Sequence, residues 1–370
     1  MDNTKLKIAF FGSSIVSAYW NGAATYYRGI VKALGNMGHE VTFYEPDIYE
    51  RQKHRDIEDP EYCRVVVYPD DEVTLRALLR EASEADVIIK ASGVGAFDEL
   101  LEFEVSQLKK ETNLIIFWDV DAPATLDRIE KDRNDPFNDL IPKYDLVLTY
   151  GGGQPVIDAY EKNGAKKCIP IYNALDTDTH FPVEPQEKFM GDLVFLGNRL
   201  PDREQRVEEF FIKPAQNLPD KKFLLGGSGW DDKPLPENIK YLGHVYTRDH
   251  NAFNCTPMAV LNISRDSMAK YGFSPATRVF EAAGAAACII TDHWKGIETF
   301  FEPNEEILVV KNGEELEKIL GELTPERARE IGEAAYKKVL AAHTYEHRAA
   351  LLEEVISRRL FGEEKTIDNH

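Results

Sequence analysis

The chain has 370 residues, of which 43% are apolar and 29% charged, and this length and composition exclude a fibrous, a disordered or a small disulfide-stabilised protein. Its 44 basic and 64 acidic residues give a net charge of −20, so we expect neither nucleic-acid nor anionic-membrane binding. No apolar run approaches the length of a membrane span or a secretory signal, which predicts a soluble, cytoplasmic chain. The four cysteines lie far apart, without a CxxC motif, and predict no metal site.

Short runs of β-branched and aromatic residues predict the strands of the first half. They are apolar on both faces, which is typical of parallel strands covered by helices on each side. The stretches between them are long enough for helices, and this alternation predicts a doubly wound α/β domain. The runs begin near Lys7, Glu40, Asp86, Asn113, Asp145 and Lys167.

The first predicted strand is followed by a loop of small residues that leads to Gly22. This loop lacks the GxGxxG spacing, which counts against a nicotinamide or flavin domain. Because ligands bind outside the carboxyl ends of parallel strands, Gly22 is expected to let a ligand approach the backbone. The alternative is that Gly22 only caps the next helix.

Two carboxylates, Asp119 and Asp121, close a buried strand and are expected to face alternate sides. Asp121 is interpreted as a base toward an acceptor hydroxyl, or as a group that orients it. Two alternatives remain open from the residues alone. The pair has the form of an Asp-x-Asp metal motif, and Asp121 suits the N-cap of a helix led by Pro123.

The same strand rhythm restarts after Pro182, so the chain is predicted to hold two Rossmann-like domains that face a central cleft. We assign them to residues 1–175 and 176–345, with a polar hinge at residues 173–187. A C-terminal helix within residues 346–370 is expected to pack back on the first domain. The strand runs of this half begin near Asp192, Lys222, Ile239, Met258, Ala287 and Glu306.

Arginines follow the first strand of the second half. Asp202 is predicted to cap the next helix, which places Arg199 and Arg203 at its amino end. Guanidinium forks suit a diphosphate at such a position. The alternative is that Arg203 and Glu204 form a solvated face.

Ser274 and Pro275 predict the start of a later helix, with Ser274 as the N-cap. The N–H groups of Ala276 and Thr277 would then be free beside Gly272, which is an anion site. Thr324 and Pro325 give a similar start signal for a helix near the end of the chain.

Glu281 lies in that predicted helix, about 7 to 10 Å from its amino end at about 1.5 Å per residue. This distance is about the reach from a phosphate to a ribose in a nucleoside diphosphate. Because the following residues 282–290 are apolar, the carboxylate needs a partner, and a ribose diol is a suitable one. The alternative is an ion pair with Arg278 or another arginine.

Several segments taken together resemble the CgeB-like, spore-maturation type of glycosyltransferase. The similarity is close in the second half, at residues 197–204, 272–284, 291–298 and 343–348. It is looser in the first half, at Asn21-Gly22 and residues 119–123.

The resemblance implies a GT-B fold, with a nucleotide-sugar donor held mainly by the second domain, an acceptor by the first, and no essential metal or bound cofactor. It also implies that Glu281 holds the ribose, that the turn at residues 272–277 and Arg199 hold the diphosphate, and that residues 243–246 hold the base. The expected donor-binding residues are Gly22, Asn198, Arg199, Arg203, Gly227, His244, Tyr246, Gly272, Phe273, Ser274, Thr277, Arg278 and Glu281, and the expected catalytic residues are Asp121 and Arg199.

The predicted activity is therefore transfer of a sugar from a donor, UDP-linked by analogy, to an acceptor hydroxyl. Retaining relatives of this fold carry two glutamates eight positions apart, whereas here Tyr271 precedes Gly272 and only Glu281 remains. The alternatives are a nucleotide-sugar-binding protein without turnover, which the missing glutamate favours, and a metal-dependent transferase or a sugar-nucleotide epimerase.

Overall fold

The computed structural model describes residues 5–265 and 272–362 and divides the chain into two compact units. The first unit contains the chain up to Tyr172 and again from Tyr345, and the second is Asn173–Thr344. The C-terminal helix therefore returns to the first unit, as its sequence predicted. No helix among the described residues is long and apolar enough to cross a membrane.

The segment expected to be a hinge, residues 173–187, is bonded into the second unit. The Leu175 N–H donates to the His343 carbonyl, and the Gln186 N–H donates to the Thr256 hydroxyl. Its polar residues predicted a hinge, but these hydrogen bonds make the segment part of the folded second unit.

The first unit is built on a parallel sheet of seven strands in the order β3-β2-β1-β4-β5-β6-β7. The strand β1 pairs on both sides, so that Phe10 lies opposite Phe43 of β2 and Ile89 of β4. This topology confirms the predicted doubly wound domain. The strands are β1 (Lys7–Phe11), β2 (Glu40–Pro46), β3 (Arg64–Tyr68), β4 (Val87–Ala91), β5 (Leu114–Asp119), β6 (Leu146–Thr149) and β7 (Cys168–Pro170).

The edge strand β3 was not predicted, whereas the helix expected between the runs at Glu40 and Asp86 is present at Glu72–Ala82. The connection from β2 to β3 contains only a 3-10 turn at Arg51–His54. Of the five β3 residues two are exposed and only one is buried, in contrast to the fully buried strands β4 and β5. The pattern of a strand buried on both faces therefore did not apply to β3.

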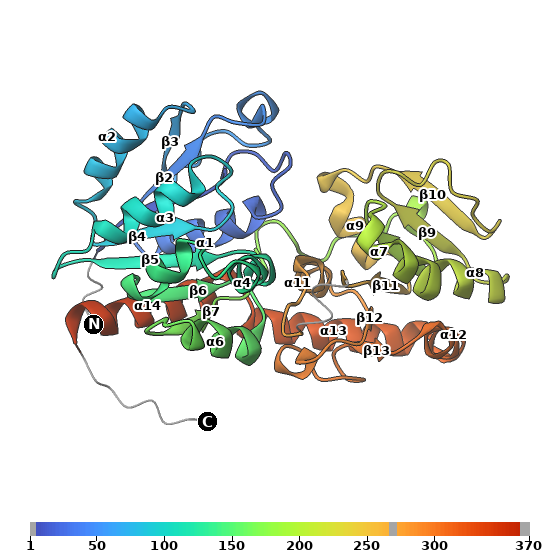
Figure 1. Cartoon of the computed structure of the whole chain (residues 1–370). Helices are drawn as coiled ribbons and strands as arrows, with labels where there is room; N and C mark the ends of the chain where they lie inside the picture. The colour runs from blue at the N-terminus through green and yellow to red at the C-terminus, as the bar shows by residue number, and fades with distance from the viewer. Residues whose placement is uncertain (1–4, 266–271, 363–370) are drawn as a thin grey trace. The chain divides into compact units, whose positions relative to one another are not determined.

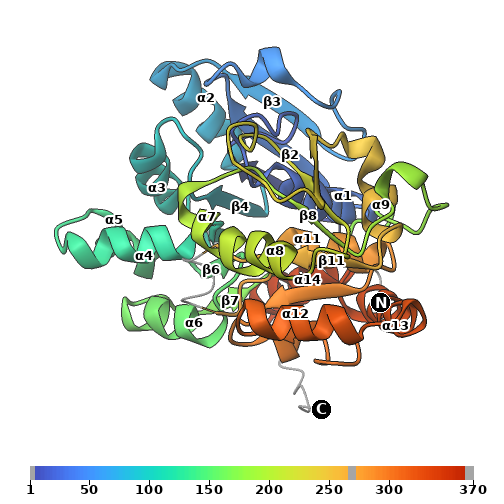
Figure 2. The ribbon, with the colours of Figure 1, turned by 90° about the vertical axis from the view of Figure 1, so that its right-hand side faces the viewer.

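Helices cover the sheet of the first unit, and α4 and α6 run side by side in both Figure 1 and Figure 2. The C-terminal helix α14 packs on α1, where Gly29 leaves room for the ring of Tyr345. The helices are α1 (Ala24–Asn36), α2 (Glu72–Ala82), α3 (Asp98–Gln107), α4 (Ala122–Lys131), α5 (Phe137–Leu140), α6 (Gly153–Lys162) and α14 (Tyr345–Phe361).

The second unit has a parallel sheet of six strands in the order β10-β9-β8-β11-β12-β13. Its strands confirm the six predicted runs of the second half. They are β8 (Leu193–Leu196), β9 (Phe223–Gly226), β10 (Ile239–Gly243), β11 (Ala259–Asn262), β12 (Ile289–Asp292) and β13 (Leu308–Val310). The helices are α7 (Pro201–Val207), α8 (Lys213–Asn217), α9 (His250–Cys255), α11 (Thr277–Gly284), α12 (Gly313–Glu322) and α13 (Pro325–Ala342), with a π-helical segment at Glu208–Ile212.

Two predicted helix starts have different outcomes. The prediction for α13 is confirmed, because the Thr324 hydroxyl accepts a hydrogen bond from the Arg327 N–H. The prediction that Asp202 caps α7 is wrong, because Leu200 holds the N-cap position. The carboxylate of Asp202 instead accepts a hydrogen bond from Arg265 at 2.7 Å.

Candidate functional site

The strand order of the second unit reverses between β8 and β11. The chain leaves β8 toward β9 and β10, and later returns to the other side of β8 through β11. Connections that leave two neighbouring strands in opposite directions open a crevice at their carboxyl ends, which is where open α/β sheets bind ligands. The loop that follows β8 and the segment that leads into α11 both belong to this edge of the sheet.

Two arginines lie against the ring of Phe195 at the end of β8. The guanidinium carbon of Arg203, on α7, is 5.5 Å from the ring centroid, and that of Arg278, on α11, is 6.0 Å from it. Arg203 also donates to the Asn198 carbonyl at 2.8 Å. Within residues 5–265 and 272–362, neither guanidinium forms an ion pair with a carboxylate.

Burial lowers the pKa of both arginines, and that of Arg278 falls to about 10. The charge of Glu281 opposes this effect at Arg278, while the charge of Arg203 adds to it. Two desolvated cations without a carboxylate partner are costly in the free protein. The arrangement therefore suits an anion that interacts with both of them.

The helix α11 begins later than predicted. Ala276, in an extended conformation, takes the N-cap position, and the Ser274 hydroxyl turns back to donate to the Gly272 carbonyl at 2.9 Å. The prediction of Ser274 as N-cap is therefore wrong. No described residue accepts a hydrogen bond from the backbone N–H of Thr277 or Arg278, so the anion-binding helix end is retained, shifted by about one residue.

The turn before α11 is held against the loop after β12. Gly272 and Phe273 both have positive φ, of +71° and +47°, and the Phe273 N–H donates to the Lys295 carbonyl. A side chain at Gly272 would come within 2.8 Å of Lys295, which explains the glycine. Phe273 stands eight positions before Glu281, at the spacing of the missing glutamate, and Tyr271 lies outside the described residues.

The exposed ammonium of Lys295 lies 5.8 Å from the ring centroid of Phe273. Sequence reasoning missed this third cation beside the turn. In the sequence, Lys295 was indicated only by its position directly before Gly296, within one of the segments that resemble the family.

Glu281 follows Arg278 by one turn of α11, and 22% of its side chain is exposed. Its neighbour is His180, whose Nε2 lies 4.0 Å from Oε1 of Glu281. No ion pair with an arginine forms among the described residues, so the arginine alternative for Glu281 is not supported. Burial lowers the pKa of the neighbouring His250, while the charge of Glu281 opposes this shift.

His250 also connects Glu281 to the segment after β10, because its Nε2 lies 3.2 Å from the Val245 carbonyl oxygen. On either side of Val245, His244 and Tyr246 are exposed, with ring centroids 4.7 Å apart in an edge-to-face arrangement. The guanidinium of Arg248 lies 5.4 Å from the Tyr246 ring. Exposed rings of this kind can stack on a planar base. No local sequence pattern marks His180 or His250 as neighbours of Glu281.

The loop after β8 is fixed to the glycine-rich loop after β9. The Asn198 side chain accepts a hydrogen bond from the Ser228 N–H at 2.9 Å, and a Cβ at Gly227 would lie 2.3 Å from the Gly197 carbonyl oxygen. Gly227, with a φ of +114°, thus serves the close approach of two protein loops. This contact by itself explains the glycine.

Arg199 is engaged by carboxylates of its own unit. Its guanidinium donates to Asp232 and to Glu204, each at 2.8 Å. These hydrogen bonds, the one to Glu204 first, raise the pKa of Arg199. Of the arginines expected to bind the donor, Arg199 is therefore already neutralised, whereas Arg203 and Arg278 have no carboxylate partner among the described residues.

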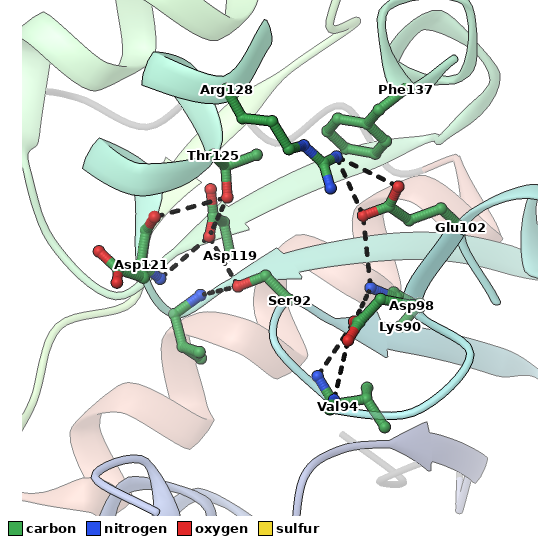
Figure 3. A network of polar contacts seen from close by, with 12 residues as sticks. Lys90, Ser92, Val94, Asp98, Glu102, Asp119, Asp121, Thr125, Arg128 and Phe137 are labelled. Carbon is green, nitrogen blue, oxygen red and sulfur yellow. Dashed lines mark hydrogen bonds and ion pairs between the residues drawn. The ribbon is translucent and has the colours of Figure 1, made fainter. Parts of the chain in front are cut away.

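In the first unit, Asp119 and Asp121 occupy different environments (Figure 3). Asp119 is fully buried and accepts hydrogen bonds from Ser92, from the Thr125 hydroxyl and from the Asp121 N–H, and its second oxygen accepts one from Tyr160. Asp121 is exposed at the N-cap position of α4, and its side chain makes no capping hydrogen bond.

The two carboxylates of this pair point to different surroundings, so they do not form a joint metal site. Among the described residues, no group of three His, Cys, Asp or Glu side chains is placed to hold a metal. Gly22 lies two residues before α1, and Ala23 holds the N-cap position, so the capping alternative for Gly22 is wrong. No atom lies within 4 Å of where a Cβ on Gly22 would stand.

Comparison with known proteins gives one family match and many structural ones. Residues 203–354 match a family model described as glycosyl transferase-like. No curated protein matches the chain in sequence. The matched segment contains Arg203, Arg278 and Glu281.

Three solved structures show the fold. Alr3699/HepE of Anabaena, in complex with UDP-glucose, superposes with a TM-score of 0.66 at 13% identity, over 95% of this chain and 99% of that chain. Sucrose-phosphate synthase of Thermosynechococcus elongatus gives 0.65 at 15% identity, over 97% and 100%. An α-glucosyltransferase in complex with UDP-glucose and DNA gives 0.68 at 12% identity, over 95% and 100%. The chain therefore has the GT-B fold.

Proposed function

We propose that the protein is a glycosyltransferase of the CgeB-like kind, which transfers a sugar from a UDP-linked donor to an acceptor hydroxyl. The observation that carries the proposal is the pair Arg203 and Arg278 at the switch point of the second sheet, which have no carboxylate partner among the described residues. The family match over residues 203–354 and the GT-B fold agree with it.

The groups of the site follow the order of a nucleoside diphosphate. The N–H groups at the start of α11 and the two arginines would hold the diphosphate. Glu281, four residues after Thr277 and so about 6 Å along the helix axis, would hold the ribose hydroxyls. His250 links Glu281 to the segment with His244 and Tyr246, which would stack on the base.

The assignment of uridine rests on the structural neighbours. Alr3699/HepE was solved with UDP-glucose and with UDP and glucose, and the α-glucosyltransferase with UDP-glucose. These proteins share the fold of this chain. We therefore propose the same nucleotide for this chain.

In the proposed reaction, the bond between the sugar's anomeric carbon and the diphosphate oxygen breaks. A new bond forms between that carbon and the acceptor oxygen, and the acceptor proton passes to Asp121. Negative charge then develops on the leaving diphosphate, where Arg203, Arg278 and the amino end of α11 would stabilise it. The exposed position of Asp121, beside the buried and fully bonded Asp119, fits a base that can reach an acceptor.

The test combines binding with turnover. We expect UDP to bind the wild type, measured by calorimetry, and the affinity to fall at least about tenfold in Arg278→Ala, because a charge-assisted hydrogen bond is lost. Arg329→Ala, which changes an exposed arginine of α13 in the same unit, is the matched control. Equal affinity in all three proteins would refute the donor site.

The remaining alternatives are separated by product analysis with UDP-glucose. A transferase releases UDP, and the release is stimulated by an acceptor. A nucleotide-sugar-binding protein binds the donor and releases none, and an epimerase converts the donor sugar without an acceptor. A metal-dependent transferase loses UDP release when EDTA is added, whereas we propose that the rate stays unchanged.

A further inference from the structure

The sheet of the first unit has a switch point of its own. In the order β3-β2-β1-β4, the chain leaves β1 toward β2 and β3 and returns on the other side through β4. Ligand crevices are expected at the carboxyl ends of β1 and β4 for the reason given for the second sheet. Residues 12–23, 47–50 and 92–97 follow β1, β2 and β4 at this edge.

One buried side chain ties these three loops together. Arg51 is only 5% exposed, and it donates to the carbonyl oxygens of Ser13 at 3.1 Å, of Trp20 at 3.3 Å and of Val94 at 3.5 Å. Its guanidinium carbon also lies 5.2 Å from the ring centroid of Tyr49. The position of each loop is therefore fixed relative to the other two.

The residues held in this way are large, exposed and strained. Trp20 is 82% exposed with a φ of +48°, and Tyr49 is 58% exposed with a φ of +54°. For a bulky side chain a left-handed backbone is sterically strained. Burial of the side chains does not offset this strain, because both rings are exposed to solvent. Strain of this kind, retained at exposed aromatic residues, is typical of ligand-binding positions.

A buried ionic network supports the third loop (Figure 3). The Asp98 carboxylate accepts hydrogen bonds from the N–H groups of Val94 and Gly95, and it pairs with the fully buried Lys90 at 2.8 Å. Burial would raise the pKa of Asp98, but the Lys90 ammonium lowers it below its ordinary value. The Tyr49 hydroxyl donates to the Gly95 carbonyl at 3.3 Å, so the network also positions the Tyr49 ring.

We propose that Tyr19, Trp20 and Tyr49 form an aromatic shelf that binds a sugar ring of a saccharide acceptor. The rings of Tyr19 and Trp20 lie edge to face at 6.2 Å, and Tyr19 is 40% exposed. The inference rests on the proposed function, since it assigns the acceptor that the transfer requires.

The surroundings of the shelf favour a saccharide over other flat or apolar partners. A sugar presents C–H groups to an aromatic face and hydroxyls at its rim. The exposed residues Asp47 and Glu50 lie within two positions of Tyr49 in the sequence and carry carboxylates that can accept hydrogen bonds from such hydroxyls. A nucleic-acid acceptor would also stack on aromatic rings, but its phosphates oppose a chain with a net charge of −20.

The shelf is also connected to the proposed base. Ser92, at the start of the loop after β4, donates to Asp119 at 2.7 Å and accepts from the Val120 N–H at 2.9 Å. Asp121 follows directly in the chain. The loop after β4 is thus hydrogen-bonded to the segment that carries Asp121.

Glycan-array binding in the presence of UDP tests the shelf directly. We expect the wild type to bind a defined set of glycans and Trp20→Ala to lose at least about tenfold of that signal. Phe103→Ala is the matched control, because Phe103 on α3 is also an exposed aromatic residue, at 49%. If no glycan binds, or if Trp20→Ala binds as the wild type does, the inference is refuted.

Tryptophan fluorescence gives a second, independent readout. Of the four tryptophans, Trp118, Trp230 and Trp294 are at most 2% exposed, so acrylamide quenches mainly Trp20. We expect a bound glycan from the array to protect this emission. Protection by single-stranded DNA or by anionic vesicles instead of glycans would contradict a saccharide acceptor. UDP binding by calorimetry separates the two proposals, because a protein that binds UDP but no glycan refutes only the shelf.

Discussion

The guanidinium groups of Arg203 and Arg278 share one aromatic ring, that of Phe195, at 5.5 and 6.0 Å from its centroid. Burial lowers the pKa of both arginines, and the charge of Arg203 lowers the pKa of Arg278 further. Like charges that are desolvated together weaken the free protein, and an anion between them removes that penalty. The two arginines should therefore favour anion binding but not stabilise the free protein.

Replacement of Arg278 by methionine should therefore have opposite effects on the two properties. We expect UDP affinity to fall by about 10- to 100-fold, the loss of about 1.5 to 3 kcal/mol for a charge-assisted hydrogen bond. The melting temperature without UDP should stay equal or rise, because an apolar chain replaces an unpaired buried charge. Calorimetry and thermal unfolding measure the two effects. A melting temperature several degrees lower would instead assign a structural role to Arg278.

Arg199→Ala should weaken UDP binding less than Arg278→Ala does, by less than about threefold. Its guanidinium is already engaged by Glu204 and Asp232, each at 2.8 Å. The same calorimetric titration ranks the two variants. An equal loss in both would mean that the carboxylates release Arg199 to the diphosphate when the donor binds, as its expected catalytic role requires.

The role of Glu281 is tested by comparison of UDP with 2′-deoxy-UDP. If Glu281 accepts a hydrogen bond from the ribose, the wild type should prefer UDP by about tenfold, the worth of one such bond to a charged group. Glu281→Ala should lose this preference. His180→Ala removes the neighbour at 4.0 Å and serves as the control, with the preference retained. A preference that persists in Glu281→Ala would place the ribose elsewhere.

The sequence predicted most of the fold because burial on both faces leaves a simple pattern. Twelve strands were located from apolar runs, and the missed strand β3 has two exposed residues among its five. The start of α13 was predicted from Thr324 because its capping hydrogen bond is local. The start of α11 was not, because the Ser274 hydroxyl bonds to the carbonyl of Gly272 instead.

The candidate site was predicted only in part, since long-range contacts decide it. Arg199 and Arg203 had the same signal in the sequence, four residues apart, and only the folded chain brings Asp232 to one of them. His180 and His250 come to Glu281 from separate segments, and no local pattern marks them. Spacing within one helix was readable, whereas partners across loops were not.

Two glycines should respond differently to alanine. Gly22→Ala meets no atom within 4 Å and needs no positive φ, so stability should change by less than about 0.5 kcal/mol. Gly227→Ala should cost about 2 to 4 kcal/mol, because its Cβ would lie 2.3 Å from the Gly197 carbonyl oxygen at a φ of +114°. Chemical denaturation measures both. If Gly22→Ala keeps its stability but loses at least about tenfold in UDP affinity, a ligand approaches that backbone; unchanged affinity would remove Gly22 from the donor set.

The pair Asp119 and Asp121 allows a structural carboxylate to be distinguished from a proposed base. Asp119→Asn replaces an acceptor of four hydrogen bonds, one of them from Tyr160, with a group that is half donor. We expect it to lose about 2 to 4 kcal/mol of unfolding free energy. Asp121→Asn alters an exposed side chain, so its stability and UDP affinity should stay unchanged.

The rate of turnover should fall more in Asp121→Asn than in Asp119→Asn, the reverse of the order expected for stability. Asp121→Asn removes the proposed base and should slow acceptor-dependent UDP release by about 100-fold or more. Asp119→Asn, assayed well below its own melting temperature, should keep more of that activity, because Asp119 acts only by positioning the segment. If Asp121→Asn retains turnover within about threefold, the base is another group, and Asp121 is reduced to the N-cap position of α4 that it occupies.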